Sequence, residues 1–222
     1  ANNVAVGHSA LLSNTTGTRN IAIGTDAYHG SDTENDNIAI GYQAMVTNTA
    51  GGTQNIGIGN YALDALTSAD NCVGIGYAAL GATTTGGNNT GVGWSALLAN
   101  STGDSHTAFG YNALASVTTS TGNTAVGTNA GDAITTANHN VAIGYNAMTT
   151  NTAGGTRNIA IGVNAYDASD TESDNIAIGY NAMTTNTAGG IENLAIGSYA
   201  MDTLTSGDKN IAIGQSSMSA IT

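Results

Sequence analysis

The sequence predicts an all-β fold, a parallel β-solenoid of about 13 coils. Three observations predict it. A block of the form Asn-Ile-Ala-Ile-Gly recurs along the chain, the spacing between the glycines that close successive blocks is 17 in nine intervals and 18 in three, and the composition includes 31 glycines and no proline. A fixed period of this kind indicates units that stack on one another. The block glycines are Gly7, Gly24, Gly41, Gly59, Gly76, Gly93, Gly110, Gly127, Gly144, Gly162, Gly179, Gly197 and Gly214.

The three longer intervals can each be assigned an extra residue in an Ala-Gly-Gly segment, at 50–52, 153–155 and 188–190. Such a segment is typical of a surface turn that tolerates insertion. A longer duplication lies over the short period, because the stretch from Asn3 to Gly76 recurs from Asn140 to Gly214, an offset of eight coils. The number of coils in the stack is therefore expected to be the feature that can vary.

Each block predicts a short strand in which Ile38 and Ile40, for example, lie on one face and Ala39 on the other. The middle position never carries a residue larger than alanine, so that side must pack closely. The last position before the glycine carries Ile, Val or Phe in every coil, which predicts a ladder of apolar side chains about 4.8 Å apart. A second apolar segment follows the glycine, as at Ala44 and Met45, so at least two segments of each coil are expected to contribute to the interior.

Asparagine opens eleven of the thirteen blocks, with Cys72 and His106 as the exceptions, and glycine closes all of them. Both columns are interpreted as corners. Glycine reaches positive φ without a Cβ penalty, while asparagine tolerates unusual backbone angles and can stack its amide on neighbouring coils. A ligand-binding row of asparagines is the alternative that the sequence favours less. The corner pairs include Asn20 with Gly24, Asn37 with Gly41, Asn140 with Gly144, and Asn175 with Gly179.

The pattern Asn-Ile-Ala-Ile-Gly-x-x-Ala, as at 37–44 and 175–182, resembles the head repeats of trimeric autotransporter adhesins and the related repeats of phage tail-fibre proteins. The resemblance covers nearly the whole chain, although the coil is slightly longer than the usual adhesin coil. It implies a left-handed parallel β-roll, three chains about a common axis, and a surface that attaches to host cells or extracellular matrix.

The residues themselves also point to association. A strand that is apolar on both faces can bury only one of them inside its own narrow coil, so the other face needs a partner. A homotrimer would provide that partner, and a wide single-chain coil that folds its own loop over the face is the alternative. We expect one uncapped solenoid domain over residues 1–222, as a segment of a longer fibre protein.

Charge and composition exclude several classes of function. Three basic residues against fifteen acidic ones give a formal net charge of -12, so the chain has no basic surface for nucleic acid. The longest apolar runs are far too short for a bilayer span, which predicts no membrane insertion. The single cysteine, Cys72, cannot form an intrachain disulfide. Because neither a catalytic set nor a pocket can be argued from a repetitive stack, we expect that the chain is not an enzyme.

Two acidic loops recur at equivalent coils, and alternating oxygen ligands of this kind can bind calcium. Neither loop has the glycine and the distal glutamate of a helix-loop-helix calcium site. We interpret both as solvated loops that resist aggregation, with calcium as the alternative and no other cofactor. The candidate ligands are Asp32, Glu34 and Asp36 in the first loop and Asp170, Glu172 and Asp174 in the second.

Aromatic residues follow the block glycine in three consecutive coils, at Tyr77, Trp94 and Tyr111. They predict an aromatic ridge. Exposed aromatic rings can serve as platforms for sugars, but a tyrosine just past a turn more often packs with its hydroxyl in water, and packing is the favoured interpretation. The four histidines lie in different coils and show no metal-ligand spacing.

The leading functional hypothesis is a rigid fibre or attachment protein, extracellular, on the surface of a virion or a cell. Its expected partners are further copies of itself, as a trimer or end to end, and a cell-surface glycan or matrix. A self-assembling extracellular filament without a receptor is the alternative. An ice-binding solenoid ranks last, because the threonines cluster in loops such as 83–85 and 118–119 and form no evident row in every coil.

Overall fold

The computed structural model describes residues 2–150, 154–168, 171–185 and 189–219. It confirms the parallel β-solenoid: the coils each contribute one strand of three residues, and the other described residues lie mainly in turns, bends and irregular backbone. The strands are β1 (Val4–Val6), β2 (Ile21–Ile23), β3 (Ile38–Ile40), β4 (Ile56–Ile58), β5 (Val73–Ile75), β6 (Thr90–Val92), β7 (Thr107–Phe109), β8 (Thr124–Val126), β9 (Val141–Ile143), β10 (Ile159–Ile161), β11 (Ile176–Ile178), β12 (Leu194–Ile196) and β13 (Ile211–Ile213).

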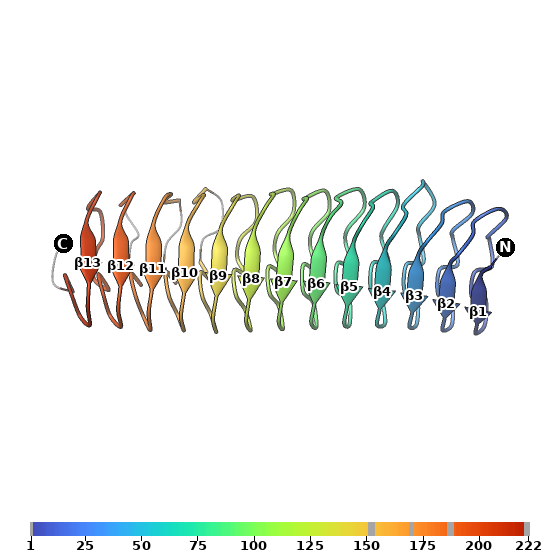
Figure 1. Cartoon of the computed structure of the whole chain (residues 1–222), viewed down its shortest axis with the longest axis horizontal. Helices are drawn as coiled ribbons and strands as arrows, with labels where there is room; N and C mark the ends of the chain where they lie inside the picture. Colours follow the sequence, from blue (N-terminus) through green and yellow to red (C-terminus); the bar gives the residue numbers. More distant parts are fainter. Residues whose placement is uncertain (1, 151–153, 169–170, 186–188, 220–222) are drawn as a thin grey trace. The chain divides into compact units, whose positions relative to one another are not determined.

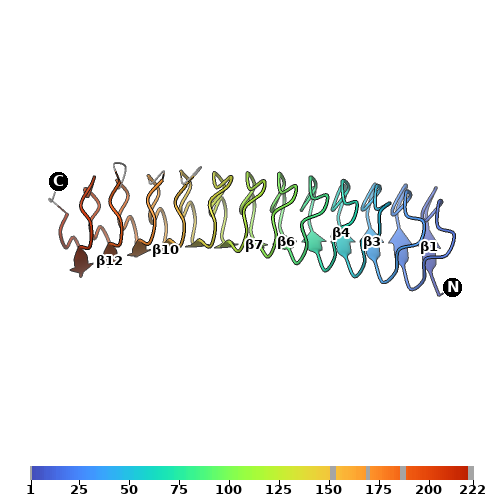
Figure 2. The ribbon, with the colours of Figure 1, turned by 90° about the horizontal axis from the view of Figure 1, so that it is seen from above.

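The chain divides into two compact units, residues 1–111 with β1 to β7 and residues 112–222 with β8 to β13. Within each unit, neighbouring strands pair in parallel and in register, so that Ile38 lies opposite Ile56 and Ala39 opposite Gly57 (Figure 1). In each unit the strands lie on one side of the coils and the turns on the other (Figure 2). None of the described residues belongs to a helix that is long and apolar enough to cross a bilayer.

The turns depend on left-handed backbone at fixed positions. All thirteen block glycines have φ between 120° and 142°. Non-glycine residues follow at the second and fourth positions after the glycine, for example Gln43 and Met45 with φ of 52° and 50°. The glycine column has no space for a side chain, because a Cβ on Gly76 would lie 2.4 Å from the carbonyl oxygen of Gly93 in the next coil. Both the positive φ and this close approach require glycine there.

The unusual backbone angle before each strand lies one residue earlier than the sequence suggested. We expected it at the asparagine, but the positive φ belongs to the residue that precedes it, as at Asp36 with φ of 62° before Asn37. The asparagine keeps an ordinary backbone, and its amide is buried.

The interior is lined by the small column of the strands, and the large ladder faces outward. Ala22 and Ala39 are fully buried, whereas the flanking Ile23 is 37% exposed and Phe109 is 43% exposed. A large side chain from the turn of the preceding coil occupies the space over the small residue, since a Cβ on Gly74 would lie 3.2 Å from Cγ of Leu63. The strand therefore contributes to the interior through its middle residue alone, and this decides which of its two apolar faces is buried.

A bulky buried side chain fills the core at the fourth position after the block glycine in most coils, and Leu66, Val117 and Leu204 add a second one at the seventh position. Where that position is Gly131, the chain compensates three residues later, because a Cβ on Gly131 would lie 3.1 Å from Cδ1 of the buried Ile134. Such compensation keeps the interior close to the density of a packed core. The fully buried residues at the fourth position include Tyr28, Met45, Leu63, Leu80, Leu97, Leu114, Met148, Tyr166, Met183 and Met201.

The buried asparagines form a ladder that ties each coil to both of its neighbours. The backbone N–H of Asn37 donates to Oδ1 of Asn20 at 2.9 Å, and Oδ1 of Asn37 accepts from the backbone N–H of Asn55 at 2.8 Å. Nδ2 of Asn37 donates to the carbonyl oxygen of Gly52 at 2.9 Å. Each amide thus satisfies two backbone groups that burial would otherwise leave unpaired.

Threonine forms a partial row, in keeping with the expectation that no row runs through every coil. The eighth residue after the block glycine is threonine or serine in most coils, and the hydroxyls of Thr67 and Thr84 each donate to the carbonyl oxygen of the equivalent residue in the next coil, Thr84 and Ser101, at 3.0 Å. These hydroxyls form hydrogen bonds within the protein, from one coil to the next.

Replacing Cys72 with asparagine is expected to raise the free energy of unfolding by about 1 kcal/mol. Cys72 occupies an asparagine position, and its Sγ lies 3.4 Å from the carbonyl oxygen of Gly86. An asparagine amide would donate to that carbonyl and accept from the backbone of Asn89. Urea unfolding of Cys72→Asn beside the control Cys72→Ala measures the effect, and equal midpoints for the two variants would contradict the ladder.

Wild-type protein is also expected to lose stability relative to Cys72→Asn as the solution becomes alkaline. Burial raises the pKa of the Cys72 thiol from 9.0 to about 11, so the unfolded chain releases this proton first. The contribution is complete below about pH 9 and is lost as the pH rises through about 11. The tyrosines titrate in both proteins, so the difference between the two unfolding free energies across this range reports on the thiol alone. A difference that stays constant with pH would contradict the raised pKa of Cys72.

Candidate functional site

Each acidic loop contains a glutamate that turns into the solenoid. Glu34 is 3% exposed, and its Oε2 accepts from the backbone N–H groups of Asp32 and Thr33 at 2.8 and 2.9 Å. Its other oxygen, Oε1, accepts from the N–H of Gly51 in the next coil at 3.1 Å. The carboxylate therefore holds its own loop together and joins it to the following turn.

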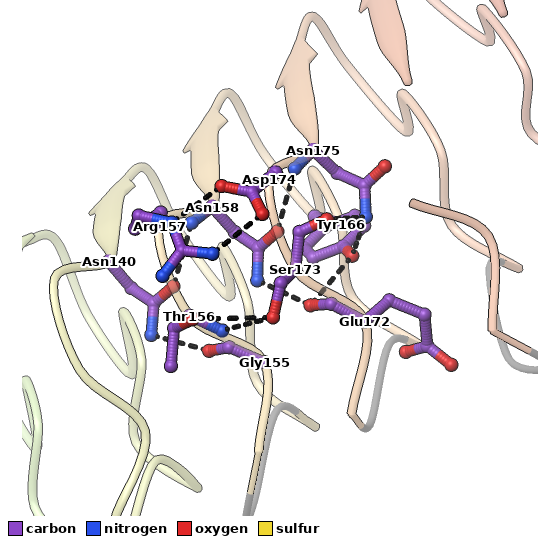
Figure 3. A network of polar contacts seen from close by, with 10 residues as sticks. All are labelled: Asn140, Gly155, Thr156, Arg157, Asn158, Tyr166, Glu172, Ser173, Asp174 and Asn175. Carbon is purple, nitrogen blue, oxygen red and sulfur yellow. Dashed lines mark hydrogen bonds and ion pairs between the residues drawn. The ribbon is translucent and has the colours of Figure 1, made fainter. Parts of the chain in front are cut away.

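The second acidic loop repeats this arrangement eight coils later. Glu172 is buried, and its carboxylate accepts from the N–H groups of Thr171 and Gly189 at 3.0 and 2.9 Å. Figure 3 shows Glu172 with its surroundings, including Asn158, whose Nδ2 donates to the Glu172 carbonyl oxygen at 2.7 Å. Sequence reasoning placed both glutamates in solvent, but the structure buries them.

The last aspartate of each loop pairs with an arginine of the preceding coil. Arg157 donates through Nε and Nη2 to the two carboxylate oxygens of Asp174, at 2.6 and 2.7 Å (Figure 3). Arg19 holds Asp36 in the same way. In each pair, the hydrogen bond from the guanidinium lowers the pKa of the aspartate. Because both pairs are exposed, they contribute more to the order of the loop than to stability.

Two buried tyrosines complete these networks, and sequence reasoning missed them. Tyr166 accepts through its hydroxyl from Nδ2 of Asn175 at 2.7 Å, and the hydroxyl of Tyr28 accepts from Nδ2 of Asn48 at 3.0 Å. Burial raises the pKa of Tyr28 well above its usual range. The signal in the sequence is that each tyrosine stands six residues before the buried glutamate of its loop, a spacing that the duplication preserves.

For the calcium alternative, the structure places the candidate ligands in different surroundings. Glu34 and Glu172 face inward, and Asp36 and Asp174 face arginines. Asp32 is exposed and accepts from the hydroxyl of Thr15, while Asp170 lies outside the described residues. Among the residues that the structure describes, no three His, Cys, Asp or Glu side chains gather in an arrangement that could hold a metal ion.

The aromatic ridge extends further than the sequence suggested. Trp94 stacks on Tyr77 with ring centroids 4.2 Å apart, and Tyr61 meets Tyr77 edge to face at 5.7 Å. Tyr42 meets Tyr61 at 5.4 Å. We call Tyr42, Tyr61, Tyr77 and Trp94 the aromatic row; Tyr111, one coil beyond Trp94, is 51% exposed. Tyr61 escaped notice because it is the second residue after its block glycine rather than the first.

Stacking limits what the aromatic row can bind. Tyr77 and Trp94 cover one face of each other's ring, so neither offers that face to a sugar. Tyr61 differs, because its plane lies at 86° to Tyr42 and 77° to Tyr77. The row is therefore a packed aromatic cluster, interrupted at Tyr61 by a ring turned across it.

The outward side chains of the strands form the second candidate surface. We call the first and last residues of each strand, with their outward side chains, the outer face. In the first unit it includes Val6, 57% exposed, and Phe109; in the second it includes Val126, Ile143 and Ile213. A row of apolar side chains of this length on a regular sheet is typical of an interaction surface.

The comparisons with known proteins add no assignment. A scan against protein-family models and searches of curated proteins and of solved structures find no match to the chain. Fold alone does not determine function, so the candidate surfaces are judged by their geometry and chemistry.

Replacing Glu34 with alanine is expected to lower the free energy of unfolding by about 1 to 3 kcal/mol, because the backbone N–H groups of Asp32, Thr33 and Gly51 lose a charged acceptor. The exposed Glu192, which lies 3.8 Å from Lys209, is the matched control, and Glu192→Ala should cost less than about 1 kcal/mol. Thermal unfolding with and without calcium completes the test. The wild-type melting temperature is expected to stay unchanged by calcium; a rise that Asp36→Asn abolishes would favour the calcium site instead.

Proposed function

We propose that the chain is a structural attachment protein: a rigid, extracellular β-solenoid of a phage tail fibre or a surface adhesin, without catalytic activity, that associates with two further copies of itself. The observation that carries this proposal is the outer face. The similarity of the Asn-Ile-Ala-Ile-Gly-x-x-Ala pattern to trimeric adhesin heads and tail-fibre repeats supports the choice of three copies and of a cell-surface glycan or matrix as the eventual target.

The energetics of the outer face support association. Each strand presents two outward side chains, mostly Ile, Val or Leu, which are part-buried or exposed in the single chain. Removing apolar surface from water is worth about 25 cal/mol per Å², so a face repeated in register over many coils can supply a large total. Charged residues are absent from it, because the acids and bases of the described residues lie outside the strands. Packing of outer faces therefore brings no like charges together.

Rigidity is the second requirement of a fibre, and three sets of bonds between coils provide it. Backbone hydrogen bonds join the strands, the asparagine ladder joins the corners, and threonine hydroxyls such as that of Thr84 join the turns. A coil that is fixed at three places around its circumference cannot bend or twist freely against its neighbour.

A filament without a specific receptor is the second candidate, because the same outer face could pair copies without limit. For ice binding, the threonine row is only partial, and the hydroxyls of Thr67 and Thr84 donate to protein carbonyls. Ice binding therefore remains the least favoured of the three.

Light scattering of the purified chain is expected to give three times the chain mass of 21.9 kDa. Replacing Phe109 or Ile143 with lysine should return the mass to that of a single chain, because a charge would be buried in the association surface. Thr119→Lys, on an exposed turn, is the matched control and should leave the trimer intact. A monomeric wild type would contradict the association, and particles of indefinite mass would favour the filament.

A further inference from the structure

A groove of about 460 Å³ lies beside the aromatic row in the first unit. Tyr61 and Tyr77 line it with their rings at 77° to each other. Asp64, Leu98 and Gly81 also line it, together with three alanines. The volume falls in the range of small-molecule sites in proteins.

One of the residues that line the groove has no side chain. Gly81 is the fifth residue after its block glycine, and the equivalent residues of the neighbouring coils are Asp64 and Leu98. A Cβ on Gly81 would lie 3.4 Å from Oδ1 of Asp64 and 3.5 Å from Cδ1 of Leu98. Gly81 is thus buried between the two, and the groove has a carboxylate on one side and an apolar wall on the other.

The chemistry of the lining favours an organic cation. Aromatic rings attract cations through their electron-rich faces, and a carboxylate adds a full negative charge. Asp64 has no basic residue among the groove-lining residues to pair with, and the net charge of -12 draws cations toward the chain. Burial raises the pKa of the Asp64 carboxyl above its usual value, so a bound cation would relieve the cost of keeping it ionised.

The same lining disfavours other ligands. A sugar ring would bring several hydroxyls against alanines and Leu98, with only Asp64 and the two tyrosine hydroxyls as polar side-chain partners. A metal ion would find one carboxylate and no further oxygen ligands among the lining side chains except those phenols. A cation whose surface consists of methyl groups matches both the apolar wall and the charge.

We propose that this groove binds a trimethylalkylammonium group, as carried by choline and by choline-bearing lipids. The Tyr61 ring contacts the methyl groups with Tyr77 beside it, Asp64 balances the charge, and Leu98 with the alanines packs against the alkyl chain. This site lies apart from the outer face, and the proposal does not depend on whether the chain forms trimers.

The duplication supplies half of a second site in the other unit. Tyr199 and Asp202 repeat the spacing of Tyr61 and Asp64, and Tyr199 meets Tyr180 at 5.3 Å. The next coil, however, has Gln215 where the first site has Tyr77. With one aromatic wall missing, the second site is expected to bind the cation more weakly, so titrations should show one stronger site per chain.

Titration with choline chloride at constant ionic strength tests the proposal. Trp94 is the only tryptophan and stacks on Tyr77, so its fluorescence reports on the groove. A saturable change with a dissociation constant on the order of 1 mM is expected. The uncharged isostere 3,3-dimethylbutanol should bind at least about tenfold more weakly, because it lacks the charge that the rings and Asp64 recognise.

Variants separate this site from general effects of charge and packing. Asp64→Asn keeps the shape and should weaken choline binding about tenfold or more, whereas Asp132→Asn, at the equivalent position of another coil, should leave it unchanged. Gly81→Leu should fill the groove and abolish binding, while Ala115→Leu, in the same column, should not. Circular dichroism shows whether each variant keeps the fold.

Three results would overturn the proposal. The first is no saturable change up to about 50 mM choline, some fifty times the expected dissociation constant. The second is equal binding of choline and its uncharged isostere with no effect of Asp64→Asn, and the third is saturable binding of a monosaccharide where choline fails. Once choline binding is measured, cosedimentation with phosphatidylcholine vesicles assigns the group to a membrane surface. Binding of free choline without cosedimentation assigns it to a soluble ligand.

Discussion

The buried amide of the block asparagine is the interaction on which the rest of the structure depends. A coil of this size has too small a core to hold its corners by packing alone, and its corner exposes backbone groups to the interior on both sides. The amide of Asn37 satisfies two backbone groups of the next coil, the N–H of Asn55 and the carbonyl of Gly52, while its own backbone N–H donates to Asn20 in the preceding coil. An aspartate would lose the donor, and a leucine would lose both groups, so an amide suits the corner better than either.

From this corner the remaining features follow in order. The asparagine fixes the register of the strand. In that register the block glycines of neighbouring coils lie so close to each other that no Cβ fits between them. Large side chains from the turns fill the narrow interior, so the middle strand residue that lies against them is alanine or glycine. With the interior filled, the isoleucines of the strand can only point outward. The apolar outer face is thus a consequence of a narrow coil and needs no separate cause.

The period, the strands and the parallel stacking could be predicted from the sequence because they depend on single columns of residues. The direction of the side chains could not. Which face of an apolar strand points inward depends on what the turn of the preceding coil places there, and the turn has alternating left-handed residues such as Gln43 and Met45 that no simple period describes. For the same reason Glu34 was interpreted as solvated: its carboxylate accepts from Gly51 in the following coil, a contact visible only after folding. The groove could not be predicted either, because Asp64, Gly81 and Leu98, which line it together, come from three different coils.

The two copies of the tyrosine, glutamate and arginine network show that the same residues produce the same contacts in both units. Tyr28 with Glu34 and Tyr166 with Glu172 are built alike because each amide, hydroxyl and carboxylate finds its partners within about one coil of sequence. Contacts of such short range make whole coils interchangeable. A recombination event that copies or deletes a multiple of the period would leave every corner satisfied. The length of the solenoid can therefore change in a single genetic step without a misfolded intermediate sequence.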